Sequence, residues 1–156
     1  MIAKKILLPS VVATSLMTLF SYLIAETEKK NFSEPELLAK IEKKKLAVSK
    51  QFALPAGWAT HYIIGIIMTL FFDVTWKQLK IKTTLHRGIT ASVFGGLIAI
   101  VSWHILFTAL PKHTHNYYMK FYTQLFIAHV LFALIVIAAQ KAACKISSYK
   151  SNTINT

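Results

Sequence analysis

Four long apolar stretches constrain the fold of this chain more than any other feature of its sequence. They cover residues 6–25, 52–72, 88–110 and 119–140. A helix needs roughly 20 apolar residues to cross about 30 Å of hydrocarbon, and each stretch is close to that length. Because a backbone in lipid must satisfy its own hydrogen bonds, single stretches of this kind are predicted to be helices. The sequence therefore predicts an all-α integral membrane protein, an antiparallel four-helix bundle.

The composition of the 156 residues agrees with a membrane protein. Hydrophobic residues make up 54% of the chain and charged residues 15%, against roughly 45–50% and about 25% in a soluble domain. The charges lie almost wholly between the apolar stretches. The net charge of +12 therefore indicates contact with anionic lipid headgroups and not with nucleic acid. We expect a single domain over residues 1–146, followed by a polar, disordered tail at 147–156.

A further helix is predicted between the first two apolar stretches, at residues 34–48. Ser33 can cap its N-terminus, and Glu34 and Pro35 suit a first helical turn. Its apolar residues share one face and lysines fill the rest: Leu37, Leu38, Ile41 and Val48 on the apolar face, Lys40, Lys43, Lys44 and Lys45 elsewhere. A basic amphipathic helix of this kind tends to lie on the bilayer surface. A solvated connector is the alternative interpretation.

The flanks of the first stretch favour a cytoplasmic location for both termini. Basic residues are equally numerous on the two sides of the membrane when the whole chain is counted. However, Lys4 and Lys5 precede the first stretch and Glu26 and Glu28 follow it, and the first helix usually sets the orientation. Leu23 is a poor residue at a signal-peptide cleavage position, so we expect the first stretch to remain as an anchor.

Three histidines lie inside apolar stretches, where ionisable residues are rare and costly. His61, His104 and His129 belong to the second, third and fourth stretches respectively. At about 1.5 Å of rise per residue, all three fall in the same half of the bilayer, within roughly 7 Å of each other in depth. We therefore expect one cluster of histidines on the side of the membrane that carries the first loop.

Ridges of small residues predict which faces of the helices point into the bundle. Gly57 and Gly65 lie four residues either side of His61, and the ridge through Ser92 and Gly96 leads to His104. Membrane helices approach closely along such ridges, so both histidines are expected to face inward. The first stretch carries hydroxyl groups at similar spacing, on Ser10, Thr14, Thr18 and Ser21.

The histidine cluster has several interpretations. The simplest is a polar core in which each imidazole bonds a hydroxyl or a carbonyl of a neighbouring helix. Two of His61, His104 and His129 could instead ligate haem b, or all three a transition metal. Proton or quinone chemistry is a further alternative. His113 and His115, in the last loop, are weak metal candidates. No catalytic motif is present in the sequence, so no catalytic residue and no enzyme activity are expected.

Four short motifs occur in the first, second and fourth stretches and in the connecting helix. They are Ala13-Thr14 with Met17-Thr18, Phe32 to Leu38, Gly57 to Tyr62 with Gly65, and Gln124 to His129. Together they resemble motifs of small four-helix inner-membrane proteins of bacteria to which no activity is assigned. The resemblance implies a bacterial inner-membrane location and carries no catalytic role over to any residue.

The leading functional hypothesis from the sequence is a structural or accessory subunit of a membrane complex. The small-residue ridges motivate it, since they could continue across an interface with another subunit or a second copy. A haem- or metal-binding protein is the main alternative. A small transporter or channel is another, and it predicts a water-filled path along Ser10, Thr14 and Thr18. The sequence shows no acidic residue in mid-span, which argues against a proton-driven transporter.

Overall fold

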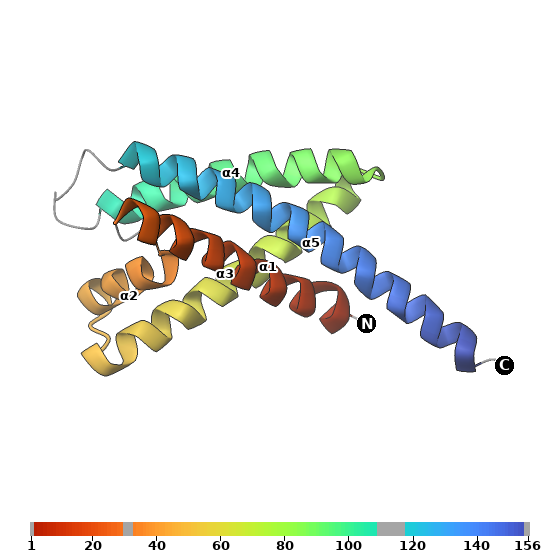
Figure 1. Cartoon of the computed structure of the whole chain (residues 1–156), viewed down its shortest axis with the longest axis horizontal. Helices are drawn as coiled ribbons and strands as arrows, with labels where there is room; N and C mark the ends of the chain where they lie inside the picture. The colour runs from red at the N-terminus through yellow and green to blue at the C-terminus, as the bar shows by residue number, and fades with distance from the viewer. Residues whose placement is uncertain (1, 30–32, 109–117, 155–156) are drawn as a thin grey trace.

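The structure, a computed structural model, consists of helices throughout the part of the chain that it describes (Figure 1). The described residues are 2–29, 33–108 and 118–154. They form α1 (Ile2–Glu28), α2 (Glu34–Lys45), α3 (Lys50–Gln78), α4 (Thr84–Thr108) and α5 (Tyr118–Ile154). The prediction of an all-α chain with a short helix after the first span is confirmed.

Four of these helices are long and apolar enough to cross a membrane, namely α1, α3, α4 and α5. Each helix begins before the corresponding apolar stretch of the sequence, and α1, α3 and α5 also end after it. A helix, once formed, extends at low cost into neighbouring polar residues, so its ends need not coincide with the ends of the apolar stretch. The predicted end of the third stretch, at Leu110, lies outside the described residues. The chain therefore has the elements of a multi-pass membrane protein.

The C-terminal helix differs from the prediction of a disordered tail at 147–156. α5 continues as far as Ile154, and Figure 1 shows its end projecting past the other helices. Neither glycine nor proline occurs between Met119 and Ile154. Extending an existing helix costs far less than starting one, and this segment contains no helix-breaking residue. The helix that begins in the fourth span therefore continues through it.

The helices pack as an incomplete ring. α5 contacts both α1 and α4 extensively, and α1 also contacts α3. By contrast, α3 and α4 have few contacts with each other. They meet near their connecting turn, where Phe72 packs against Gly95, and Figure 1 shows them diverging from there. The bundle is therefore closed at the end that carries this turn and open between α3 and α4 at the other end.

The short helix α2 packs against α3 and is not free to lie flat on a lipid surface. It spans Glu34–Lys45, three residues shorter than predicted. Leu38, Ala39 and Ile41 on its apolar face are buried, while the lysines on its opposite face are exposed. Gly57 of α3 makes this contact possible, because a methyl group there would overlap the Pro35 carbonyl oxygen. α2 thus fills the space under the diverging helices, with its basic face outward.

Two hydrophobic clusters form the core. One surrounds Phe72, Trp76 and Phe132, and the rings of Phe72 and Phe132 meet edge to face at 6.2 Å between centroids. The other surrounds Trp103 and Phe121, whose ring centroids are 5.4 Å apart, and it includes the apolar face of α2. A cavity lies between the two clusters, and both of them contribute to its lining.

Candidate functional site

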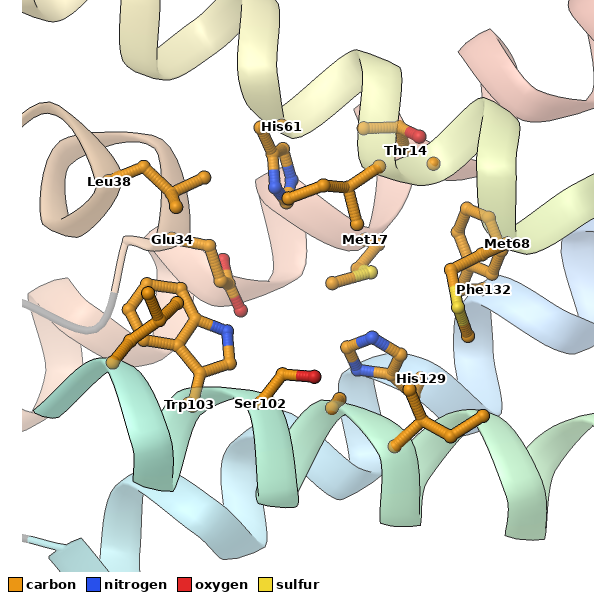
Figure 2. A pocket seen from close by; sticks show the side chains of 15 residues that line it. Thr14, Met17, Glu34, Leu38, His61, Met68, Ser102, Trp103, His129 and Phe132 are labelled. Carbon is orange, nitrogen blue, oxygen red and sulfur yellow. The ribbon is translucent and has the colours of Figure 1, made fainter. Parts of the chain in front are cut away.

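The cavity between the two core clusters has a volume of about 180 Å³ and is lined by all five helices. Most of its lining is apolar, from residues such as Met17, Met68 and Phe132. Figure 2 shows His61 and His129 directed into this space from opposite sides, with Glu34 nearby. Two of the three histidines predicted to cluster therefore do come together, and a carboxyl group that no sequence pattern indicated lies beside them.

The hydrogen bonds around His61 fix which ring nitrogen carries the proton. Its Nε2 lies 2.9 Å from Oγ1 of Thr18, and that hydroxyl already donates its hydrogen to the Thr14 carbonyl oxygen at 2.7 Å. The hydroxyl oxygen must therefore accept, so Nε2–H of His61 donates. A neutral imidazole has one donor and one acceptor, which makes Nδ1 of His61 the acceptor.

His129 is fixed in the opposite tautomer. Its Nδ1 lies 2.9 Å from the carbonyl oxygen of Leu125, one turn earlier in α5. A carbonyl oxygen can only accept, so Nδ1–H donates and Nε2 becomes the acceptor of the neutral ring. His129 is buried, like His61, with 8% of its surface exposed. Each histidine thus uses its N–H within the bundle and keeps a lone pair for the cavity.

Glu34 is the third ionisable group at the cavity, and only 1% of it is exposed. Its Oε1 accepts hydrogen bonds from Oγ of Ser21 at 2.8 Å and from Nε2 of Gln124 at 3.4 Å. Its Oε2 has no hydrogen-bond partner among the described residues. Burial raises the pKa of Glu34 from 4.5 to about 7, against the opposing effect of its hydrogen bonds.

His104 does not belong to this cluster, which corrects the prediction that all three histidines would meet. Its side chain is exposed, and its Nδ1 lies 3.1 Å from the hydroxyl of Tyr122. The ridge of small residues predicted that His104 faces inward like Gly96, and Gly96 does pack against Phe126 of α5. However, each step of four residues turns about 40° around a helix, so two steps carry His104 about 80° away from Gly96.

The geometry does not fit the alternative interpretation of the histidines as a haem or metal centre. Among the described residues, no three histidine, cysteine or acidic side chains are placed to hold a metal ion together. Pockets for drug-sized ligands measure about 300–1,000 Å³. A cavity of about 180 Å³ is therefore too small for a haem between His61 and His129. The weak candidates His113 and His115 lie outside the described residues.

The small-residue ridges are used inside the chain. Gly65 packs against Thr14, Gly95 against Phe72 and Gly96 against Phe126. The inward orientation predicted for the ridges of Gly65 and Gly96 is confirmed. Since their surfaces are already covered, these glycines no longer support an interface with another subunit.

The hydroxyl stripe of α1 also faces inward, as its spacing indicated. Ser10, Thr14, Thr18 and Ser21 are all buried.

Comparisons with protein-family models, with curated proteins and with solved structures gave no match to this chain. The function proposed for it therefore rests on its geometry alone.

Proposed function

We propose that this chain is a multi-pass protein of the bacterial inner membrane that binds a small molecule in its central cavity. In this proposal the four spans are antiparallel and both termini are cytoplasmic. One observation carries it: the lone pairs of His61 and His129 and the unpartnered Oε2 of Glu34 belong to side chains that line the same cavity. Buried polar atoms are normally paired, so atoms left unpaired around a cavity are typical of a binding site.

The lining favours an organic molecule over water alone. A water molecule in a buried cavity needs two to four polar partners, and most of the lining of this cavity is apolar. Met68 and Phe132 supply apolar surface on the side away from Glu34. A ligand with one polar end and one apolar end satisfies both parts of the lining.

A binding site agrees better with the packing than an open channel does. The channel hypothesis requires a continuous wet path along Ser10, Thr14 and Thr18. Ser10 and Thr18 are 0% and 2% exposed, and each donates its hydroxyl hydrogen to a carbonyl oxygen of its own helix. Only Thr14 of this stripe lines the cavity. The polar face of α1 is therefore packed above and below the site.

The accessory-subunit hypothesis stays a prediction, without the argument from small residues. A protein that co-purifies in mild detergent would support it, and a monomer with no partner would count against it. We propose no catalytic role for any residue.

The histidines provide a matched test of the binding function, because two of them line the cavity and the third does not. Solvent extraction and mass spectrometry of the purified protein should detect a bound small molecule in the wild type and in His104→Ala. In His61→Ala and His129→Ala its amount should fall about tenfold or more, since each change removes a hydrogen bond in a buried site. Circular dichroism would verify that all variants stay helical. Equal amounts in all four proteins, or none in the wild type, would contradict the proposal.

A further inference from the structure

The cavity has its mouth on the side of the bundle. At its deep end Thr14 and Glu34 are each 1% exposed, whereas Ile64 of α3 and Ile98 of α4, on its rim, are 40% and 39% exposed. These two isoleucines lie near the middle of α3 and α4, the helices that diverge from their connecting turn. An apolar opening at mid-span faces hydrocarbon in a membrane, so a ligand reaches this cavity from the lipid.

Three side chains of the cavity, His61, His129 and Glu34, present hydrogen-bond acceptors to it, beside the Thr14 hydroxyl, which has no partner among the described residues and can donate or accept. The tautomers derived above make Nδ1 of His61 and Nε2 of His129 acceptors, and an ionised Glu34 can only accept. A headgroup that contains only hydrogen-bond acceptors therefore finds no donor among these three side chains. A headgroup with several N–H donors and a positive charge complements all of them, and its bonds to a carboxylate are the stronger, charge-assisted kind.

The rest of the lining suits the same ligand. Trp103 lines the cavity beside Glu34, and aromatic faces attract cations. Met68 and Phe132 line it further from Glu34, where their flexible and apolar side chains can cover a hydrocarbon tail. The cavity thus has a polar part around Glu34 and a separate apolar part, as an amphiphile requires.

We infer that the cavity takes an amphiphile with a primary ammonium headgroup, which enters from the lipid between α3 and α4 and binds Glu34 in its ionised form. This inference rests on the proposed binding function and specifies the class of ligand. The titratable groups that face Glu34 across the cavity are His61 on α3 and His129 on α5. The described parts of α1 and α4 line it with groups that do not titrate, such as Thr14 and Ser102.

Acid should therefore prevent binding. The pKa of Glu34, about 7, means that its carboxyl group is neutral in acid and attracts a cation much less. Protonation of His61 or His129 would add positive charge and act in the same direction. Among the described residues that line the cavity, no other group titrates and opposes this trend.

The test uses the full chain in lipid nanodiscs and three probes with the same tail: decylamine, decanol and decanoate. Tryptophan fluorescence would report occupation of the cavity, and the Trp103→Phe variant would show that Trp103 carries the signal. At about pH 8.5 decylamine should bind about tenfold or more tightly than decanol or decanoate. The preference should disappear at about pH 5, where decylamine is still charged and Glu34 is not.

A second carboxylate of α2 gives the control. Glu34→Gln should abolish the preference for decylamine, while Glu36→Gln should keep it. Glu36 accepts a hydrogen bond from the Tyr22 hydroxyl at 3.1 Å and does not line the cavity. Equal binding of the three probes, or a preference that survives Glu34→Gln, would overturn the inference. The binding function would still stand if the co-purified molecule depended on His61 and His129. If the amount of the co-purified molecule did not depend on His61 and His129, the proposed binding function itself would be contradicted.

Discussion

Replacing Glu34 with glutamine is expected to remove the pH dependence that this carboxyl group gives to the stability of the protein. The pKa of Glu34 rises from 4.5 to about 7 on burial. Each pKa unit corresponds to about 1.4 kcal/mol, so ionisation of this one buried group costs the native state about 3 kcal/mol. Because only 1% of the residue is exposed, solvent does little to reduce that cost.

The direction of the effect follows from the two pKa values. Between pH 4.5 and about 7 the native protein keeps a proton on Glu34 that the unfolded chain has already lost. Stability falls with rising pH wherever the native state binds more protons. The free energy of unfolding of the wild type should therefore fall by about 3 kcal/mol, relative to Glu34→Gln, as the pH rises from about 4 to about 8. Above that range the difference should stay constant.

Equilibrium unfolding in mixed micelles, repeated over this pH range, would measure the difference. Glu36→Gln is the control, since it removes a carboxylate from the same helix that is only half-buried. A glutamine at position 34 places an amide near the cavity, but that cost does not vary with pH. The slope of the difference is therefore diagnostic. A difference that is flat, or that has the opposite sign, would contradict burial of this carboxyl group.

The sequence was sufficient to predict the elements of this fold because each depends on local physics. Span length follows from hydropathy, and the inward face of α1 follows from the spacing of its hydroxyl groups. Likewise, the position of His61 between Gly57 and Gly65 keeps it within about 40° of two close contacts, so its inward orientation could be predicted. His104 lies eight residues after Gly96, which corresponds to a turn of about 80° around the helix, so the inward orientation of Gly96 does not extend to it.

Glu34 could not be selected from the sequence, although it is the most informative residue of the site. An acidic residue in the first turn of a helix is explained by the helix dipole, and lysines elsewhere on α2 indicated a surface position. Its burial depends on α1 and α5, which supply Ser21 and Gln124 to its carboxyl group. Contacts between residues so far apart in the chain leave no periodic pattern. Thr14, Glu34, His61 and His129 belong to four different short motifs of the sequence, and all four residues line the cavity.

Gly57→Ala is expected to destabilise the protein by about 1–3 kcal/mol, the usual cost of overpacking a close contact. Alanine normally stabilises a helix relative to glycine, by up to about 1 kcal/mol. At Gly57, however, the added methyl group would overlap the Pro35 carbonyl oxygen and lie 2.7 Å from the Ala39 nitrogen. Both are backbone atoms of α2, so no side chain can rotate away, and the whole helix must shift.

Gly88→Ala is the matched control, because a methyl group there would meet only side-chain atoms of Leu134 and Ile137, at an ordinary 3.8 Å. It should be neutral or stabilising in the same unfolding measurement. A shift of α2 also moves Glu34 out of its buried position and lets solvent reach its carboxyl group, so Gly57→Ala should reduce the pH dependence that Glu34 gives to the wild type. Gly88→Ala should keep it. If Gly57→Ala were as stable as Gly88→Ala and equally dependent on pH, the close contact of α2 with α3 would be refuted, and with it the placement of Glu34 at the cavity.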